Sequence, residues 1–182
     1  AKEYPKTVVG MKDSSGDWAY TESVIKLLAP SGFRVYAGSE VFLMRTLRAG
    51  GVGCISATAN VNPRAIAELA AHWQESDADQ RQAALDQVRS VFAQYQMIAG
   101  MKTAVAHYSK DSEWLRVRPP LVQLSADKQA KLLGELQKMN FWDIVHPEFR
   151  KQTRERGLKR QTGEMQPSSY ELKIMQKKGA SK

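Results

Sequence analysis

The chain has 182 residues, of which 42% are hydrophobic and 25% charged, as in an ordinary soluble globular protein. Its one cysteine excludes an internal disulfide framework, and its three histidines fit no zinc-ligand spacing, so neither a metal site nor a cofactor is predicted. No apolar run approaches the ~20 residues that a membrane helix needs, and no signal peptide is evident. We therefore expect no membrane association, and a cytoplasmic location.

The net charge of +8 is concentrated at one end of the chain. Residues 146–182 hold ten Lys and Arg residues against four Glu residues, which amounts to +6, and the rest of the chain carries only +2. The body of the protein therefore has no electrostatic footprint for a nucleic acid, and no nucleic-acid partner is expected of it. Because residues 145–182 have little to bury, we expect a basic, flexible tail there.

The first 62 residues predict three strand–helix units in series. The expected strands cover residues 7–11, 33–37 and 52–59, and the expected helices cover residues 18–29 and 41–49. Strands that alternate with helices of this length imply a parallel sheet, with ligand chemistry at the carboxyl ends of the strands. Lys12 and Gly38 both follow directly after an expected strand.

The remainder of the body is helical in its pattern. Apolar residues recur at helical spacing over residues 63–75, 79–95, 97–109 and 125–139, and Arg118-Pro119-Pro120 interrupts them once. We expect these helices, within residues 63–144, to form a layer appended to the sheet.

Lys12 is the candidate for chemistry. Burial of an ammonium group is costly, so a lysine at the end of an apolar strand is expected to have a lowered pKa and a free, nucleophilic amine. Such an amine condenses with a ketone to an iminium, which acidifies the adjacent carbon and permits carbon–carbon bond formation or cleavage. The alternative, favoured on position alone, is a lysine that extends to the rim of the sheet and pairs with Asp13.

Three segments change that balance. Residues 8–17, VVGMKDSSGD, resemble the Schiff-base lysine strand of the dihydrodipicolinate synthase and N-acetylneuraminate lyase family. Residues 37–40, AGSE, and 50–60, GGVGCISATAN, fit the next two strands of that family at its separations from the lysine. Residues 118–121, RPPL, are similar to its C-terminal signature, so the resemblance covers residues 1–144.

The resemblance implies an α/β fold, the C-terminal part of a (β/α)8 TIM barrel. Residues 1–62 would hold three βα units, strands six to eight, and residues 63–144 the closing helix and a C-terminal helical layer. A complete barrel needs about 250 residues, so strands one to five are expected to be absent, with the family's Thr-rich loop and proton-shuttling tyrosine. Three strands would leave two open edges and one uncovered face, so full activity from this chain alone is not expected.

The resemblance also implies a reaction and a site. Lys12 would form the iminium, Gly38 and Ile55 would line the pocket for a 2-oxo acid, and Glu40 would contact the second substrate, an aldehyde. A complete barrel would be expected to form a homo-oligomer. The simpler interpretations are that Gly38 is a turn glycine and Ile55 a core residue of its strand.

Nearby residues receive structural interpretations. Ser14 and Ser15 are expected to cap the helix that follows them. Cys54 lies within a strand and far in sequence from any histidine, so a core position is favoured over a nucleophile. The glycines of residues 50–53 precede a strand, which indicates a helix-to-strand turn and not a nucleotide-binding loop.

The substrate and the direction of the reaction stay open. Asp13 after the lysine is more similar to the aldolase and lyase branches of the family than to 4-hydroxy-tetrahydrodipicolinate synthase of lysine biosynthesis, which remains an alternative. Val41 and Ala57 stand where sialic acid lyases have polar groups, so a shorter, less hydroxylated aldehyde is favoured over a polyol. The alternative from another class is a non-catalytic half barrel whose basic tail binds nucleic acid or an acidic partner.

Overall fold

The computed structural model describes residues 3–141, which lie in one compact unit, Ala1–Val145. The predicted basic tail, residues 145–182, lies outside the described residues. In chain order the elements are β1 (Gly10–Asp13), α1 (Trp18–Leu28), the 3-10 turn Ala29–Ser31, β2 (Arg34–Ala37), the 3-10 turn Glu40–Phe42, α2 (Leu43–Arg48), β3 (Gly53–Cys54), the 3-10 turn Thr58–Asn60, α3 (Pro63–Ala71), α4 (Ala78–Ala93), α5 (Met97–Ser109), the 3-10 turn Ser112–Leu115 and α6 (Ala126–Lys138).

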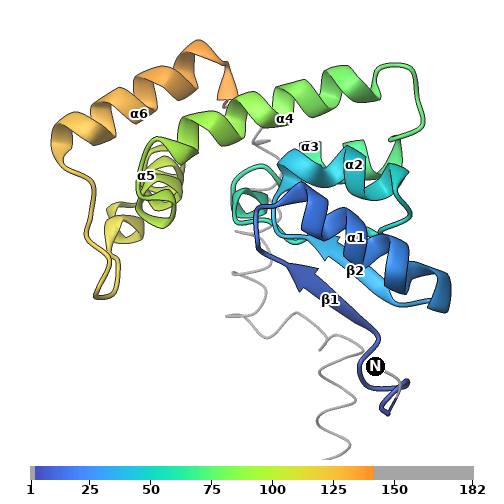
Figure 1. Ribbon diagram of the computed structural model, residues 1–182. Helices are drawn as coiled ribbons and strands as arrows, with labels where there is room; N and C mark the ends of the chain where they lie inside the picture. Colours follow the sequence, from blue (N-terminus) through green and yellow to red (C-terminus); the bar gives the residue numbers. More distant parts are fainter. Residues whose placement is uncertain (1–2, 142–182) are drawn as a thin grey trace, which may run out of the picture. The chain divides into compact units, whose positions relative to one another are not determined.

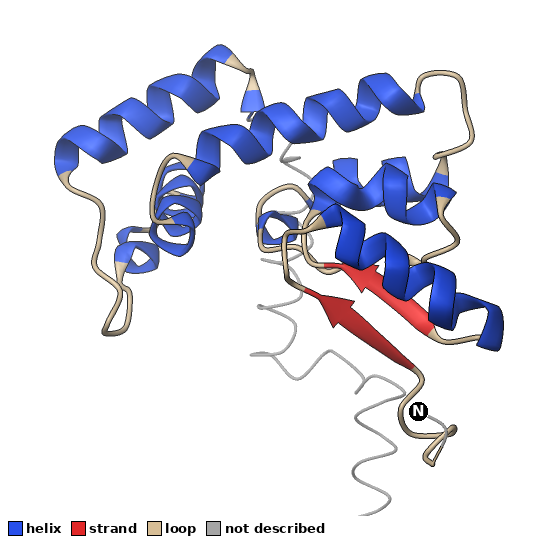
Figure 2. Ribbon diagram, in the orientation of Figure 1, coloured by secondary structure: helices blue, strands red, loops and turns tan. Residues whose placement is uncertain are grey.

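The three strands form a parallel sheet in the order β1-β2-β3, as the alternation of strands and helices predicted. Helices α1 and α2 lie together on one face of it (Figures 1 and 2). We call this face the covered face and the other the open face. Val35 and Ala37 of β2 point into the covered face and are fully buried, whereas Lys12 of β1 is exposed on the open face. Side chains alternate along a strand, so each strand contributes to both faces.

The third strand is much shorter than predicted. The sequence predicts one strand over residues 52–59, but β3 comprises only Gly53–Cys54, although the N–H of Ile55 still donates to the carbonyl of Ala37 at 2.9 Å. After Ile55 the backbone leaves the sheet. The hydroxyls of Ser56 and Thr58 donate to the buried carboxylate of Glu40. Polar partners inside the fold therefore end the strand that hydrophobicity alone would have extended.

The helices after the sheet are confirmed, with ends that differ from the predicted ones by a few residues. Two apolar clusters hold them: α2, α3 and the start of α4 share a cluster around Leu43, Leu69 and Leu85, and α4, α5 and α6 share a larger one around Phe92 and Leu132. None of the helices in residues 3–141 has the length and hydropathy to span a membrane. The division between residues 1–62 and 63–144 stays a prediction, since all of them belong to one unit.

Candidate active site

Lys12 stands on the open face beside an aromatic neighbour. Its register partner on β2 is Tyr36, whose own partner on β3 is Gly53. Register partners on neighbouring parallel strands point to the same face and lie about 4.8 Å apart. Gly53 lies beside the ring, but space does not require glycine there, since a Cβ at this position would lie 3.9 Å from Tyr36 Cδ1, an ordinary contact; its φ of 146° does. Tyr36 was not predicted as a site residue, although alternation along its strand places it opposite the buried Val35 and Ala37.

The expected burial of Lys12 is wrong for the described part of the chain. The side chain is exposed, because no other element of residues 3–141 covers the open face around it. Nor does Lys12 pair with Asp13, whose side chain points to the opposite face and is buried there. The amine is thus presented outward from the end of β1, at the carboxyl edge of the sheet.

Asp13 instead ties β1 to the first helix. Its carboxylate accepts hydrogen bonds from the Ser15 N–H and hydroxyl, both at 2.9 Å, and from the Thr21 hydroxyl of α1. Burial raises the pKa of Asp13, but the hydrogen bonds from Thr21 and Ser15 outweigh it and hold the pKa below its ordinary value. The carboxylate is therefore a structural anchor directly after the candidate nucleophile.

The prediction that Ser14 and Ser15 cap the first helix is wrong. Asp17 is the N-cap of α1, and its side chain accepts from the N–H of Ala19 at 2.9 Å. Ser15 bonds to Asp13 and accepts from the Asp17 N–H at 3.1 Å, so it shapes the loop before the cap. Aspartate and serine are comparable N-caps, so the sequence offered several candidates within one short loop.

Gly38 is required by a close approach of two loops. A Cβ at this position would lie 2.6 Å from the carbonyl oxygen of Asp13 and 2.9 Å from Cα of Ser14. Only glycine lets the end of β2 pass this close to the segment that follows Lys12. This explains the residue type without a ligand, and a pocket-lining role for Gly38 stays a prediction.

Ile55 follows β3, and half of its surface is exposed, at 50%. It alternates with Cys54, which is partly buried on the covered side, and follows Gly53 by two residues, so it belongs to the open face with Lys12. The interpretation of Ile55 as a core residue is therefore wrong. Its contact with a substrate stays a prediction that the position allows.

Glu40 lies beneath the sheet edge, not on the open face. Its side chain is 1% exposed, and the hydroxyls of Ser56 and Thr58 donate to its two carboxylate oxygens. Arg89 Nη1 lies 3.6 Å from Glu40 Oε2 and donates to Ser56 Oγ at 3.4 Å. The carboxylate is fully engaged, so the geometry gives no support to the expected contact of Glu40 with a second substrate.

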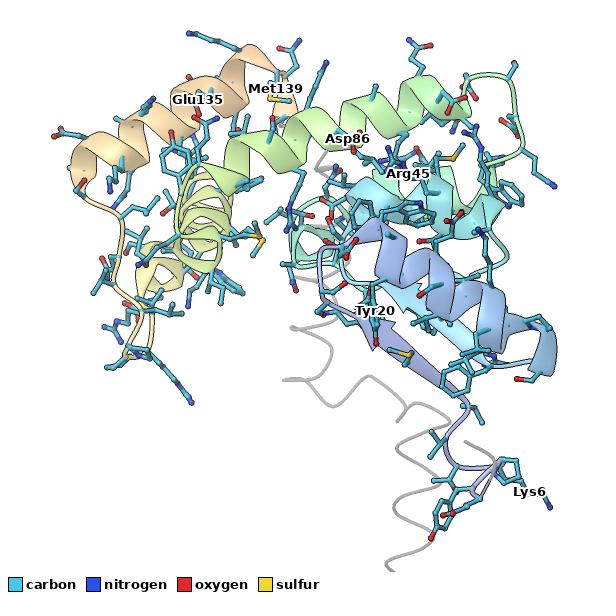
Figure 3. All side chains as sticks on the ribbon, in the orientation of Figure 1. Lys6, Tyr20, Arg45, Asp86, Glu135 and Met139 are labelled. Carbon is cyan, nitrogen blue, oxygen red and sulfur yellow. The ribbon has the colours of Figure 1, made fainter. Side chains whose placement is uncertain are left out.

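Helix α4 reaches the same place with a second polar side chain. Gln82 Nε2 donates to the backbone carbonyl of Glu40 at 3.0 Å, and its Oε1 accepts from the N–H of Met44 at 3.1 Å. Asp86, on the α4 face toward Arg45 of α2 (Figure 3), has its pKa raised by burial and by the charge of Glu40, against a hydrogen bond from Gln82. Sequence reasoning missed this support, which joins residues far apart in the chain.

Cys54 is a weak nucleophile in this arrangement. Burial, with a smaller contribution from the negative charge of Glu40, raises the pKa of its thiol to about 11. Residues 3–141 also hold no group of three or more His, Cys, Asp and Glu side chains arranged as metal ligands.

Comparison with known proteins relates the chain to one family. The model of the dihydrodipicolinate synthetase family matches residues 2–139. A 4-hydroxy-tetrahydrodipicolinate synthase of Methanopyrus kandleri is 32% identical over 143 residues, 76% of this chain and 46% of the relative. An uncharacterized DapA-like lyase of Chloroflexus aurantiacus is 32% identical over 124 residues, 68% of this chain and 40% of the relative. The chain thus spans about half the length of the curated relatives it matches.

Solved structures of the same family have a similar fold. Dihydrodipicolinate synthase from Agrobacterium tumefaciens superposes with a TM-score of 0.62 at 28% identity, over 76% of this chain and 45% of that one. YagE, an E. coli prophage protein of the dihydrodipicolinic acid synthase family solved in complex with pyruvate, gives a TM-score of 0.65 at 26% identity, over 74% of this chain and 46% of that one. The described fold corresponds to about half of such a chain.

Proposed function

Because the chain belongs to the dihydrodipicolinate synthetase family, we propose that it carries the iminium-forming lysine of a class I lyase or aldolase acting on pyruvate or another 2-oxo acid. The observation that carries the proposal is the place of Lys12, exposed at the carboxyl end of β1 on the face that no helix of residues 3–141 covers. YagE, a structural relative that binds pyruvate, supports the choice of substrate.

The chemistry follows from the amine. The unprotonated Nζ of Lys12 adds to the keto carbon, and one of its protons passes to the former carbonyl oxygen. A second proton, from solvent, lets that oxygen leave as water while the nitrogen lone pair closes the C=N bond. The cationic iminium then draws electrons from the adjacent carbon, which loses a proton to give an enamine that attacks an aldehyde. Hydrolysis releases the product and restores the amine, and the same steps in reverse cleave the bond.

Open-face neighbours are proposed to shape the pocket. Tyr36 presents a ring and a phenol hydroxyl next to Lys12, and Ile55 offers an apolar surface for the carbon chain of the substrate. Gly38 keeps the loop after Lys12 close to the end of β2. Val41 and Ala57 offer no hydrogen bond at the rim, so we propose a short aldehyde partner in place of a polyol.

The described residues supply one wall of a site. We place β1, β2 and β3 as strands six to eight of an eight-stranded barrel, so that the open face lines the barrel interior. We propose that turnover needs the other wall, which residues 3–141 do not contain, and that a complete barrel assembles into a homo-oligomer. The names of several relatives keep the 4-hydroxy-tetrahydrodipicolinate synthase reaction as the second candidate.

Borohydride trapping tests the proposal. The protein is incubated with pyruvate and borohydride, and intact-mass spectrometry is expected to find one reduced adduct. Lys12→Ala should abolish it, whereas Lys6→Ala, at an exposed lysine before β1 (Figure 3), should leave it unchanged. A folded wild-type protein that forms no adduct, or equal adducts in all three proteins, would contradict the assignment.

A further inference from the structure

A buried polar cluster lies beneath the loops that border the open face. It consists of Glu40, Ser56, Thr58 and Arg89, and we call it the Glu40 cluster. Its members come from three separate segments: the turn after β2, the loop after β3, and helix α4. Ser56, Thr58 and Glu40 are buried, and the side chain of Arg89 is largely so.

The members of the Glu40 cluster compensate the buried charge of Glu40. A buried carboxylate is tolerated only when donors and a positive charge compensate its lost hydration. Here two hydroxyls donate to the two carboxylate oxygens and Arg89 supplies the charge, while Ser56 Oγ lies 3.1 Å from Thr58 Oγ1. The geometry therefore fixes three segments against one another, because each would leave a buried polar group unpaired if it moved away.

Two members of the Glu40 cluster are close in sequence to residues at the open face. Ser56 directly follows Ile55, and Glu40 lies two residues after Gly38, whose backbone touches the segment after Lys12. A shift of the loop after β3 by even a fraction of an ångström would move Ile55 relative to Lys12. Gln82 adds a second tie, from α4 to the backbone of Glu40.

We propose that the Glu40 cluster is a positioning device for the site, through which helix α4 sets the distance between Ile55 and Lys12. Glu40 acts from beneath and does not touch the substrate, and Arg89 makes the helical layer part of the support of the site. The consequence for pyruvate capture rests on the function proposed above; the consequence for the loop does not.

Two variants separate positioning from a general loss of stability. Glu40→Gln removes the charge that Arg89 compensates, and Arg89→Met removes the guanidinium at a less buried position that is more tolerant of change. Glu135→Gln is the control, because this carboxylate on α6 (Figure 3) accepts a side-chain hydrogen bond within the helical layer, from the Tyr95 hydroxyl at 3.1 Å. Arg89→Lys tests whether the charge alone restores the effect.

The readouts are amide hydrogen exchange and pyruvate trapping. In Glu40→Gln and Arg89→Met we expect exchange over residues 53–60 to rise about tenfold, with α6 unchanged. We also expect the half-saturating pyruvate concentration for the adduct to rise several-fold, with its final amount unchanged and a partial return in Arg89→Lys. Glu135→Gln should change neither.

Exchange that is unchanged over residues 53–60, or that rises equally in α6, would overturn the proposal. If the wild type forms no adduct, the proposed function fails while exchange still decides on the cluster.

Discussion

The two faces of the small sheet differ in how their polar groups are used. On the covered side, Asp13 and Glu40 are buried and every carboxylate oxygen has a donor, from Ser15 and Thr21 in one case and from Ser56 and Thr58 in the other. On the open side, Lys12 and Tyr36 form no ion pair or side-chain hydrogen bond within residues 3–141. The polar groups of the covered face hold the fold together, whereas Lys12 and Tyr36 of the open face take no part in this within the described residues.

The difference explains why neighbouring residues in one motif have unrelated roles. Lys12 and Asp13 are adjacent, yet alternation along β1 sends one to the open face and the other into the protein. Gly38 and Glu40, which follow β2, also have different roles, since one sits at the loop contact and the other is buried. A motif that is taken as a list of site residues therefore mixes residues of the open face with buried structural residues.

The largest stability effect is expected on the covered face at Asp13. Asp13→Ala removes the acceptor of three hydrogen bonds and leaves the buried Thr21 hydroxyl with only the Asp17 carbonyl, so the free energy of unfolding should fall by about 3 kcal/mol. Urea denaturation followed by circular dichroism measures it. The matched control is Glu22→Ala, which removes a surface pair with Lys26 and should cost ~0.5 kcal/mol or less. Equal effects of both variants would contradict the contrast between the faces.

Cys54 should react slowly. With a pKa of about 11 in place of 9.0, its thiolate fraction at pH 8 is about a hundredfold lower than that of a cysteine in unfolded protein. Alkylation by iodoacetamide, followed by mass spectrometry with and without denaturant, should show at least this ratio, and the rate should keep rising with pH up to about 11. A folded-state rate that levels off near pH 9 would show that burial does not control this thiol.

Gly38→Ala probes the loop contact between the two strand ends. The added methyl group would overlap the carbonyl oxygen of Asp13, so we expect a loss of about 2 kcal/mol in unfolding free energy. Gly134→Ala on α6 is the control, because a Cβ there meets nothing within 4 Å and alanine favours the helix. If the two variants have equal stability, the close approach is not what requires glycine at position 38.

The smallest effect on stability is expected on the open face. Tyr36→Phe removes a hydroxyl that has no partner within the described residues and retains the ring beside Gly53, so unfolding free energy should change by ~0.5 kcal/mol or less. The same denaturation experiment measures it. A loss comparable to that of Asp13→Ala would mean that the open face is also structural.

Local patterns gave the order of strands and helices, the parallel sheet, and Lys12 at a strand end. They failed where a distant residue decides the outcome. β3 ends early because Ser56 and Thr58 bond to Glu40, and the role of Glu40 depends on Arg89, which bonds to Ser56 across 33 residues of sequence. The N-cap of α1 was missed for another reason, since Ser14, Ser15 and Asp17 have similar capping ability and only the backbone geometry selects Asp17.

The most direct test of the account observes the iminium at equilibrium. Pyruvate labelled with a carbon isotope at its keto carbon is added to the folded protein and to its Lys12→Ala variant, and NMR follows the labelled carbon. The account predicts a protein-bound signal in the range of an iminium or its enamine that is lost in Lys12→Ala and kept in Lys6→Ala. An iminium signal that persists without Lys12 would contradict it, because the reactive amine would then lie elsewhere than on the open face of the sheet.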